Sequence, residues 1–267
     1  MAKIDRATEH LETLKSEIRA WLNSEPYGVI KKFEPESGRH SLILDVKGAA
    51  NFERYALIAG DCAQNLRCVL DHLVYNLALE GPKGMPDKPR VLQFPLCDTP
   101  DDFNGQRYRI ASLTEEAQKF IESKQPYNRA HAELPPIMAV LNDFNNIDKH
   151  RLVHVTYNCN STGQLSFTRA VSQIVSLTVW LNKPLENGDE IAHFFSASKS
   201  EVPYNLQISL TVGVSHIPGP SRRTTSPLES VLVGMLEEVK RIVSSANDIG
   251  HICAFPPKEI YSESERA

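Results

Sequence analysis

Apolar residues recur at three- and four-residue steps in two stretches of the N-terminal half, and this spacing predicts two helices. The first is expected from about residue 4 to residue 22, with Leu11, Leu14 and Ile18 on its apolar face. The second, from about residue 51 to residue 79, is longer. One continuous apolar stripe runs along it, formed by Ile58, Cys62, Leu66, Val69, Leu73 and Leu77.

Between and after these helices, the pattern predicts a hairpin and two shorter helices. Residues 29–33 and 41–46 read as strands, and the turn between them ends at Gly38. Two further helices are expected near residues 114–123 and 134–145.

After about residue 153 the pattern changes from helical spacing to alternation. Apolar and polar positions alternate most clearly between residues 205 and 214, which is typical of a strand with one buried face. This half predicts an antiparallel sheet. A final helix is expected from Ser226, because Ser, Pro and Glu there suit a first helical turn.

The expected fold class is therefore α+β: a helical bundle half with a long central helix, packed against a C-terminal antiparallel sheet and a final helix. We expect one compact unit over residues 1–267. Its helical part would reach about residue 153, the sheet and terminal helix would occupy residues 154–250, and residues 257–267 would form a frayed tail.

Composition narrows the classes of function. The net charge of -4 argues against a broad basic surface for nucleic acid. No run of about 18 apolar residues is present, so no membrane partner is expected. Five cysteines occur without a C-x-x-C pair, which disfavours a disulfide framework or a zinc site and favours a reducing, cytoplasmic setting. Glycine-rich phosphate-binding patterns are absent, and no cofactor is expected.

The long helix carries the densest candidate chemistry along one edge of its apolar stripe. At about 100° per residue, one narrow stripe contains Asp61, Asn65, Cys68, His72 and Asn76. Polar groups at such an edge need hydrogen-bond partners, so the simplest interpretation is a structural network. In the alternative, Asn65 and His72 project into a cleft, where His72 acts as a base or a ligand.

A second polar constellation spans residues 142–154. If this stretch is helical, His150 and His154 lie one turn apart and can ligate a metal. Alternatively, residues 148–151 bind a phosphate or carboxylate, with Arg151 as a bidentate fork. The simplest interpretation is a capped helix end whose charges tie the helical half to the sheet.

Arg67 and Asp71 lie four residues apart on the far side of the long helix, where we expect a surface ion pair. Arg67 and His72 also form an Arg, four residues, His pattern that resembles the HEPN superfamily, helical-bundle proteins that are often metal-independent ribonucleases. The resemblance implies that Arg67 steadies the scissile phosphate and His72 activates or orients the ribose 2′-hydroxyl. It also implies a cleft formed by two subunits. If residues 142–154 fold near this helix, His150 and Arg151 would serve as auxiliary groups of such an enzyme.

Three short motifs together resemble a group of uncharacterised bacterial proteins. The resemblance spans about residues 50–155 and implies a bacterial or phage origin. The motifs are Asn65-Leu66-Arg67 followed by Asp71-His72, then Phe94-Pro95-Leu96, and then Asn146-Ile147-Asp148-Lys149-His150-Arg151-Leu152.

We therefore expect a ligand-binding or interaction module with a polar network of His, Asp and Arg. The alternative is a HEPN-like endoribonuclease or another phosphate-handling enzyme. Its partner would be RNA or a small anionic ligand, and a second copy of the chain is a further candidate. The candidate catalytic residues are His72, Arg67 and His150. The candidate ligand-binding residues are Asn65, Asp71, Asp148, Lys149 and Arg151.

Overall fold

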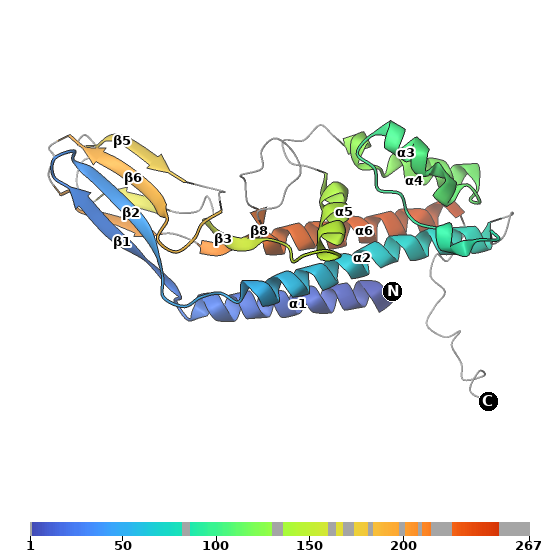
Figure 1. The fold of residues 1–267 in the computed structure, drawn as a ribbon, viewed down its shortest axis with the longest axis horizontal. Coiled ribbons are helices and arrows are strands. Elements are labelled where there is room, and N and C mark those ends of the chain that lie inside the picture. The colour runs from blue at the N-terminus through green and yellow to red at the C-terminus, as the bar shows by residue number, and fades with distance from the viewer. Residues whose placement is uncertain are drawn as a thin grey trace, which may run out of the picture. The chain divides into compact units, whose positions relative to one another are not determined.

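A computed structural model of the chain describes residues 2–81, 86–129, 136–159, 164–167, 174–180, 184–197, 201–207, 210–214 and 226–250 (Figure 1). The α-helices are Ala2–Asn23 (α1), Phe52–Glu80 (α2), Pro100–Gln106 (α3), Glu115–Ser123 (α4), Ile137–Asp148 (α5) and Leu228–Gly250 (α6). The 3-10 turns are Pro89–Val91 (η1), Arg107–Ile110 (η2) and Pro126–Arg129 (η3). The strands are Tyr27–Glu34 (β1), Arg39–Val46 (β2), Val155–Cys159 (β3), Gln164–Phe167 (β4), Ile174–Val179 (β5), Glu190–Ser196 (β6), Tyr204–Gln207 (β7), Leu210–Val214 (β8) and Ser226–Pro227 (β9).

The α+β fold class is confirmed, as are the two long N-terminal helices and the hairpin. The hairpin turn uses Gly38 at a φ of 72°, a conformation that other residues rarely adopt. The strand expected over residues 205–214 is present as β7 and β8, and residues 208–209 and the expected tail at 257–267 lie outside the described residues. Within the described ranges, no helix has both the length and the apolar character needed to cross a membrane.

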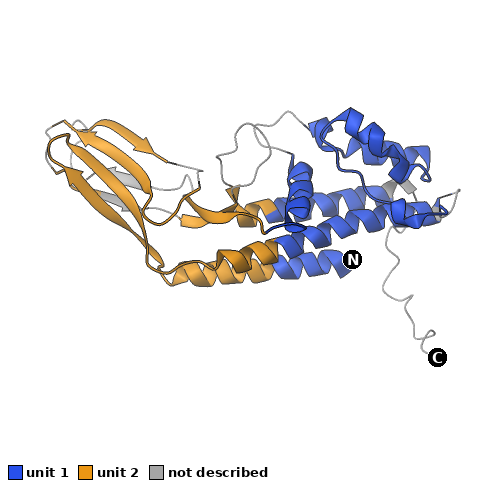
Figure 2. Ribbon diagram, viewed as in Figure 1, with its two compact units in different colours: residues 1–11, 60–151, 232–267 blue, residues 12–59, 152–231 orange. Residues whose placement is uncertain are grey.

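Contacts divide the chain into two compact units, and neither is continuous in sequence (Figure 2). Unit 1 comprises residues 1–11, 60–151 and 232–267, and unit 2 comprises residues 12–59 and 152–231. The division does not follow the expected boundary near residue 153, because β1 and β2 belong to unit 2 with the later strands. That the whole chain behaves as a single unit stays a prediction.

Unit 1 is built on the C-terminal part of α2, which is buried over a wide face. Leu66, Leu70 and Leu73 have no exposed surface, and burial of each such side chain contributes roughly 1.5–3 kcal/mol. The start of α1 packs on this helix, where the Cys62 thiol donates to the Ala7 carbonyl at 3.5 Å. The result is a rigid helix from which polar side chains can be positioned accurately.

Unit 2 contains an antiparallel sheet in the order β1-β2-β6-β5. The predicted N-terminal hairpin therefore supplies half of this sheet, because β2 pairs with β6. The core below it includes Leu42, Leu44 and Phe194. Trp21 stacks on Tyr157 with ring centroids 5.7 Å apart, so it packs in this core as an anchor. Smaller sheets are β3-β8-β9 and β4-β7.

Candidate functional site

Arg67 and Asp71 of α2 together hold the backbone of Phe94. Asp71 Oδ1 accepts a hydrogen bond from the Phe94 N–H at 2.9 Å, and Arg67 Nη2 donates to the Phe94 carbonyl at 2.5 Å. The two side chains are also paired with each other at 3.0 Å, as expected for residues one helical turn apart. The predicted ion pair is therefore confirmed, but it is not a surface pair: the Arg67 side chain is only 11% exposed.

The segment that includes Phe94, residues 93–97, has no regular secondary structure, and side chains satisfy its backbone groups. Gln125, which is fully buried, donates to the Pro95 carbonyl at 2.9 Å and accepts from the Cys97 N–H at 3.1 Å. Arg109 in η2 donates to the side-chain carbonyl of Gln93. Buried backbone groups without a β-sheet neighbour need such partners, so these polar side chains fix the position of the segment.

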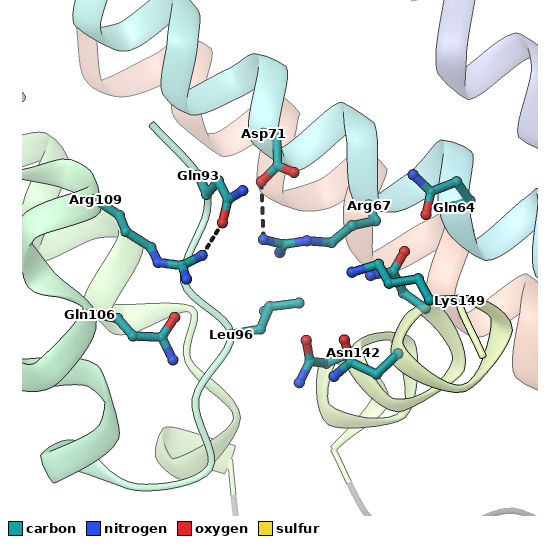
Figure 3. Close-up of a pocket in the computed structure, with 11 residues that line it drawn as sticks. Gln64, Arg67, Asp71, Gln93, Leu96, Gln106, Arg109, Asn142 and Lys149 are labelled. Atoms are coloured by element: carbon teal, nitrogen blue, oxygen red, sulfur yellow. Dashed lines mark hydrogen bonds and ion pairs between the residues drawn. The ribbon is translucent and has the colours of Figure 1, made fainter. Parts of the chain in front are cut away.

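A polar pocket of about 480 Å³ opens beside this segment (Figure 3). Arg67 and Asp71 line one wall, and Gln93 and Arg109 line another. Among the described residues that line it, Leu96 is the only one with an apolar side chain. Most ligand pockets have predominantly apolar walls, so this lining is unusually polar.

Helix α5 contributes one face of the pocket through residues at helical spacing. Asn142, Asn145, Asn146 and Lys149 all line it, and their spacing places them along one side of the helix. Asn145 is buried, whereas Lys149, the residue that caps the C-terminal end of α5, is exposed. The pocket therefore combines a row of amides with an exposed cation, Lys149.

The charge in the pocket is predominantly positive. The described part of its lining contains three cationic side chains, Arg67, Arg109 and Lys149, and a single carboxylate, Asp71. Burial lowers the pKa of the Arg67 guanidinium; Asp71 acts against this, and the nearby Arg109 adds to it. A buried cation whose charge is opposed by burial and by a like charge is stabilised by any anion that comes close.

Several polar atoms at this site have no partner within the described residues. They are Arg67 Nη1, Arg109 Nε and Asn145 Oδ1, and all three are buried. Leaving a buried polar group unsatisfied costs about 1–3 kcal/mol, and more for a charged group. Such atoms in a native protein call for an explanation, and a bound polar ligand or ordered water provides one.

No family model, curated protein or solved structure matches this chain.

The pocket gathers three of the residues predicted to carry function: Arg67, Asp71 and Lys149. Asn65 lies elsewhere, where its side-chain amide donates to the Asp61 carbonyl at 2.7 Å and its oxygen accepts from Lys3 at 3.2 Å. For Asn65, these contacts are hydrogen bonds of the kind expected at the helix edge.

The three other basic candidates lie outside the pocket. His72, His150 and Arg151 are exposed and do not line it. Arg67 and His72 therefore do not share one cavity, and the HEPN-like endoribonuclease stays a prediction. Within the described residues, which include His72, His150 and His154, no group of three or more potential His, Cys, Asp or Glu ligands could hold a metal ion.

Asp148 faces α2 rather than the pocket. A Cβ at Gly60 would overlap its carboxylate, with Asp148 Cγ only 2.5 Å away. Burial raises the pKa of Asp148, and the charge of Asp61 adds to the rise. Asp148 therefore lies against α2 at the end of α5, one residue before Lys149, and is not among the residues that line the pocket.

Sequence reasoning missed much of the lining, most importantly Arg109, Gln93 and Gln106. The α5 stripe of Asn142, Asn145, Asn146 and Lys149 did carry a signal, because polar residues at this spacing interrupt an otherwise apolar helix. Arg109 and Gln93 carried none, since Arg109 lies in the short 3-10 turn η2 and Gln93 in a segment without regular secondary structure.

Proposed function

We propose that this chain is a ligand-binding module that takes a small anion in the pocket beside residues 93–97. One observation carries the proposal: the buried Arg67 Nη1 and Arg109 Nε have no partner within the described residues. Both side chains line a pocket with three cations and one carboxylate, and that carboxylate, Asp71, is already engaged with Arg67 and the Phe94 N–H.

The chemistry favours binding over catalysis. A phosphate or carboxylate accepts charge-assisted hydrogen bonds from guanidinium groups, which are about twice as strong as neutral ones. Among the described residues that line the pocket there is no histidine or cysteine, and the one carboxylate, Asp71, is already engaged with Arg67 and the Phe94 N–H. Anion binding alone accounts for the cationic side chains that line the pocket, and no reaction needs to be assumed.

The test compares two basic residues that are close in sequence. Lys149 lines the pocket, whereas Arg151 does not, and both are exposed near the end of α5. Lys149→Gln and Arg151→Gln remove one positive charge each, so Arg151→Gln is a matched control. The measurement is the thermal midpoint in inorganic phosphate or acetate against sodium chloride of equal ionic strength.

We expect phosphate or acetate to raise the midpoint of the native chain and of Arg151→Gln, and to raise that of Lys149→Gln less. A ligand at about ten times its Kd stabilises by roughly 1.4 kcal/mol. Equal responses of the two variants, or no response of the native chain to either anion, would refute the proposal.

A further inference from the structure

Resting on the proposed anion site, we infer that its ligand is a small hydroxylated anion, a polyol or sugar that carries a phosphate or carboxylate group. The pocket volume of about 480 Å³ is far larger than an inorganic anion needs, since a water molecule takes up about 30 Å³. The ligand therefore has a body as well as a charged group.

The unpartnered atoms of the pocket are of two opposite kinds. Arg67 Nη1 and Arg109 Nε are donors and require an acceptor, which an anion supplies. Asn145 Oδ1 is an acceptor, and it too is buried without a partner in the described part of the chain. A fully deprotonated phosphate or carboxylate cannot donate to it, whereas a hydroxyl group on the same ligand can.

The remaining lining also favours hydroxyl groups as hydrogen-bond donors. Asn142, Asn145 and Asn146 present three carboxamides along one face of α5, and Gln64 and Gln106 add two more from α2 and α3. A carboxamide both donates and accepts, and so does a hydroxyl group, so the two are complementary in either orientation of the amide. A row of carboxamides therefore suits a chain of hydroxyl groups.

An aromatic ligand body is disfavoured by the same lining. Among the described residues that line the pocket none is aromatic, and Leu96 is the one apolar side chain. Two arginines could stack on a nucleobase, but these residues do not supply the apolar contact that usually accompanies such stacking. In Figure 3 the Arg67 side chain lies between Arg109 on one side and Lys149 on the other. Because Arg109 is close enough to lower the pKa of Arg67, the anionic group belongs between these two arginines and the hydroxylated body along α5.

The experiment measures binding by calorimetry with matched probes. Glycerol 3-phosphate and propyl phosphate share a phosphate and a three-carbon chain, but only the first has free hydroxyl groups. Glycerate carries a carboxylate in place of the phosphate. Comparing it with glycerol 3-phosphate therefore shows which of the two anionic groups the pocket binds. Inorganic phosphate tests the anion alone.

We expect glycerol 3-phosphate or glycerate to bind at least about tenfold more tightly than propyl phosphate, a difference of about 1.4 kcal/mol. Asn146→Ala should reduce this preference, whereas Asn104→Ala should not, because Asn104 is exposed on α3 and does not line the pocket. If propyl phosphate binds as tightly as both hydroxylated probes, the hydroxylated body is wrong and the anion site stands. If no anion binds, the proposed function itself fails.

Discussion

The carboxylate of Asp148 occupies the space that a side chain at Gly60 would take. Glycine inside a helix normally costs about 0.5–1 kcal/mol relative to alanine, and position 60 lies well inside α2. The close approach of α5 therefore requires glycine here despite that cost.

The first prediction concerns this contact. Gly60→Ala should lower the free energy of unfolding by about 1–3 kcal/mol, because the new methyl group displaces Asp148 and the end of α5. In an Asp148→Ala background the same substitution should raise it by about 0.5–1 kcal/mol, since only the helix preference remains. Urea unfolding of the four proteins measures this cycle, and the same sign in both backgrounds would contradict it.

The second prediction concerns the ionisation of Asp148. Its pKa is raised from 3.8 by burial and by Asp61, so the folded chain holds this proton more tightly than the unfolded chain does. The ionised carboxylate therefore lowers stability above the folded pKa, and the loss disappears as the pH falls toward 3.8. Asp148→Asn should raise the thermal midpoint near neutral pH, with a gain that shrinks on acidification.

Asp61→Asn provides the comparison for that measurement. This substitution removes the charge of Asp61, which is the smaller of the two causes of the raised pKa of Asp148. It should therefore raise the thermal midpoint by a smaller amount than Asp148→Asn does. A lower midpoint for Asp148→Asn at neutral pH would show that the carboxylate makes a favourable contact that outweighs its burial.

The third prediction concerns the hydrogen bonds by which Arg67 and Asp71 fix the backbone of Phe94. Arg67→Gln should destabilise the chain by about 2–4 kcal/mol, because it leaves Asp71 and the Phe94 carbonyl without their cationic partner. Hydrogen exchange at residues 93–97 should become faster in this variant. Arg107→Gln is the control: it breaks an exposed pair with Glu122, and exposed pairs contribute about 0–1 kcal/mol. If hydrogen exchange at residues 93–97 is as slow in Arg67→Gln as in the native chain, Arg67 does not fix the backbone of Phe94.

The fourth prediction concerns the thiols. Burial raises the pKa of Cys62 to about 12 and that of Cys97 to about 11. Since the thiolate is the reactive species, neither should be alkylated in the folded chain near neutral pH, and the partly exposed Cys68 should react first among these three. Peptide mapping after iodoacetamide treatment, with and without urea, gives the answer; alkylation of Cys62 before unfolding would contradict it.

The same shifts predict the behaviour of the chain in alkali. Unfolded thiols ionise near 9.0, whereas Cys62 and Cys97 stay protonated in the folded chain to about 12 and about 11. Stability should therefore fall as the pH rises above about 9. Cys62→Ala and Cys97→Ala should each reduce this slope, measured as the change of the urea midpoint with pH.

The elements were largely predictable because their signals are local. The apolar stripe of α2 and the turn ending at Gly38 each depend on residues that are neighbours in the sequence. The sheet order was less accessible, since the pairing of β2 with β6 joins segments about 150 residues apart in the chain.

The site was predictable only where it lies on helices. The Arg67–Asp71 pair follows from their spacing, but their common target, Phe94, lies beyond a proline-rich loop that has no periodicity. The chemical versatility of histidine favours functional interpretations of His72 and His150, yet the three-dimensional fold decides which side chains meet a pocket. Both are exposed, whereas the buried Asn145 lines it.

The side-chain anchoring of residues 93–97 has a consequence for how related sequences can differ. Each anchor binds a particular backbone group, so deletion of one residue would shift the segment by about 3.3 Å and break the contacts of Arg67, Asp71 and Gln125 together. Changes in loop length should therefore be tolerated before Gln93 and excluded between Gln93 and Cys97. In relatives of this chain, the identities of positions 67, 71 and 125 should covary as a group.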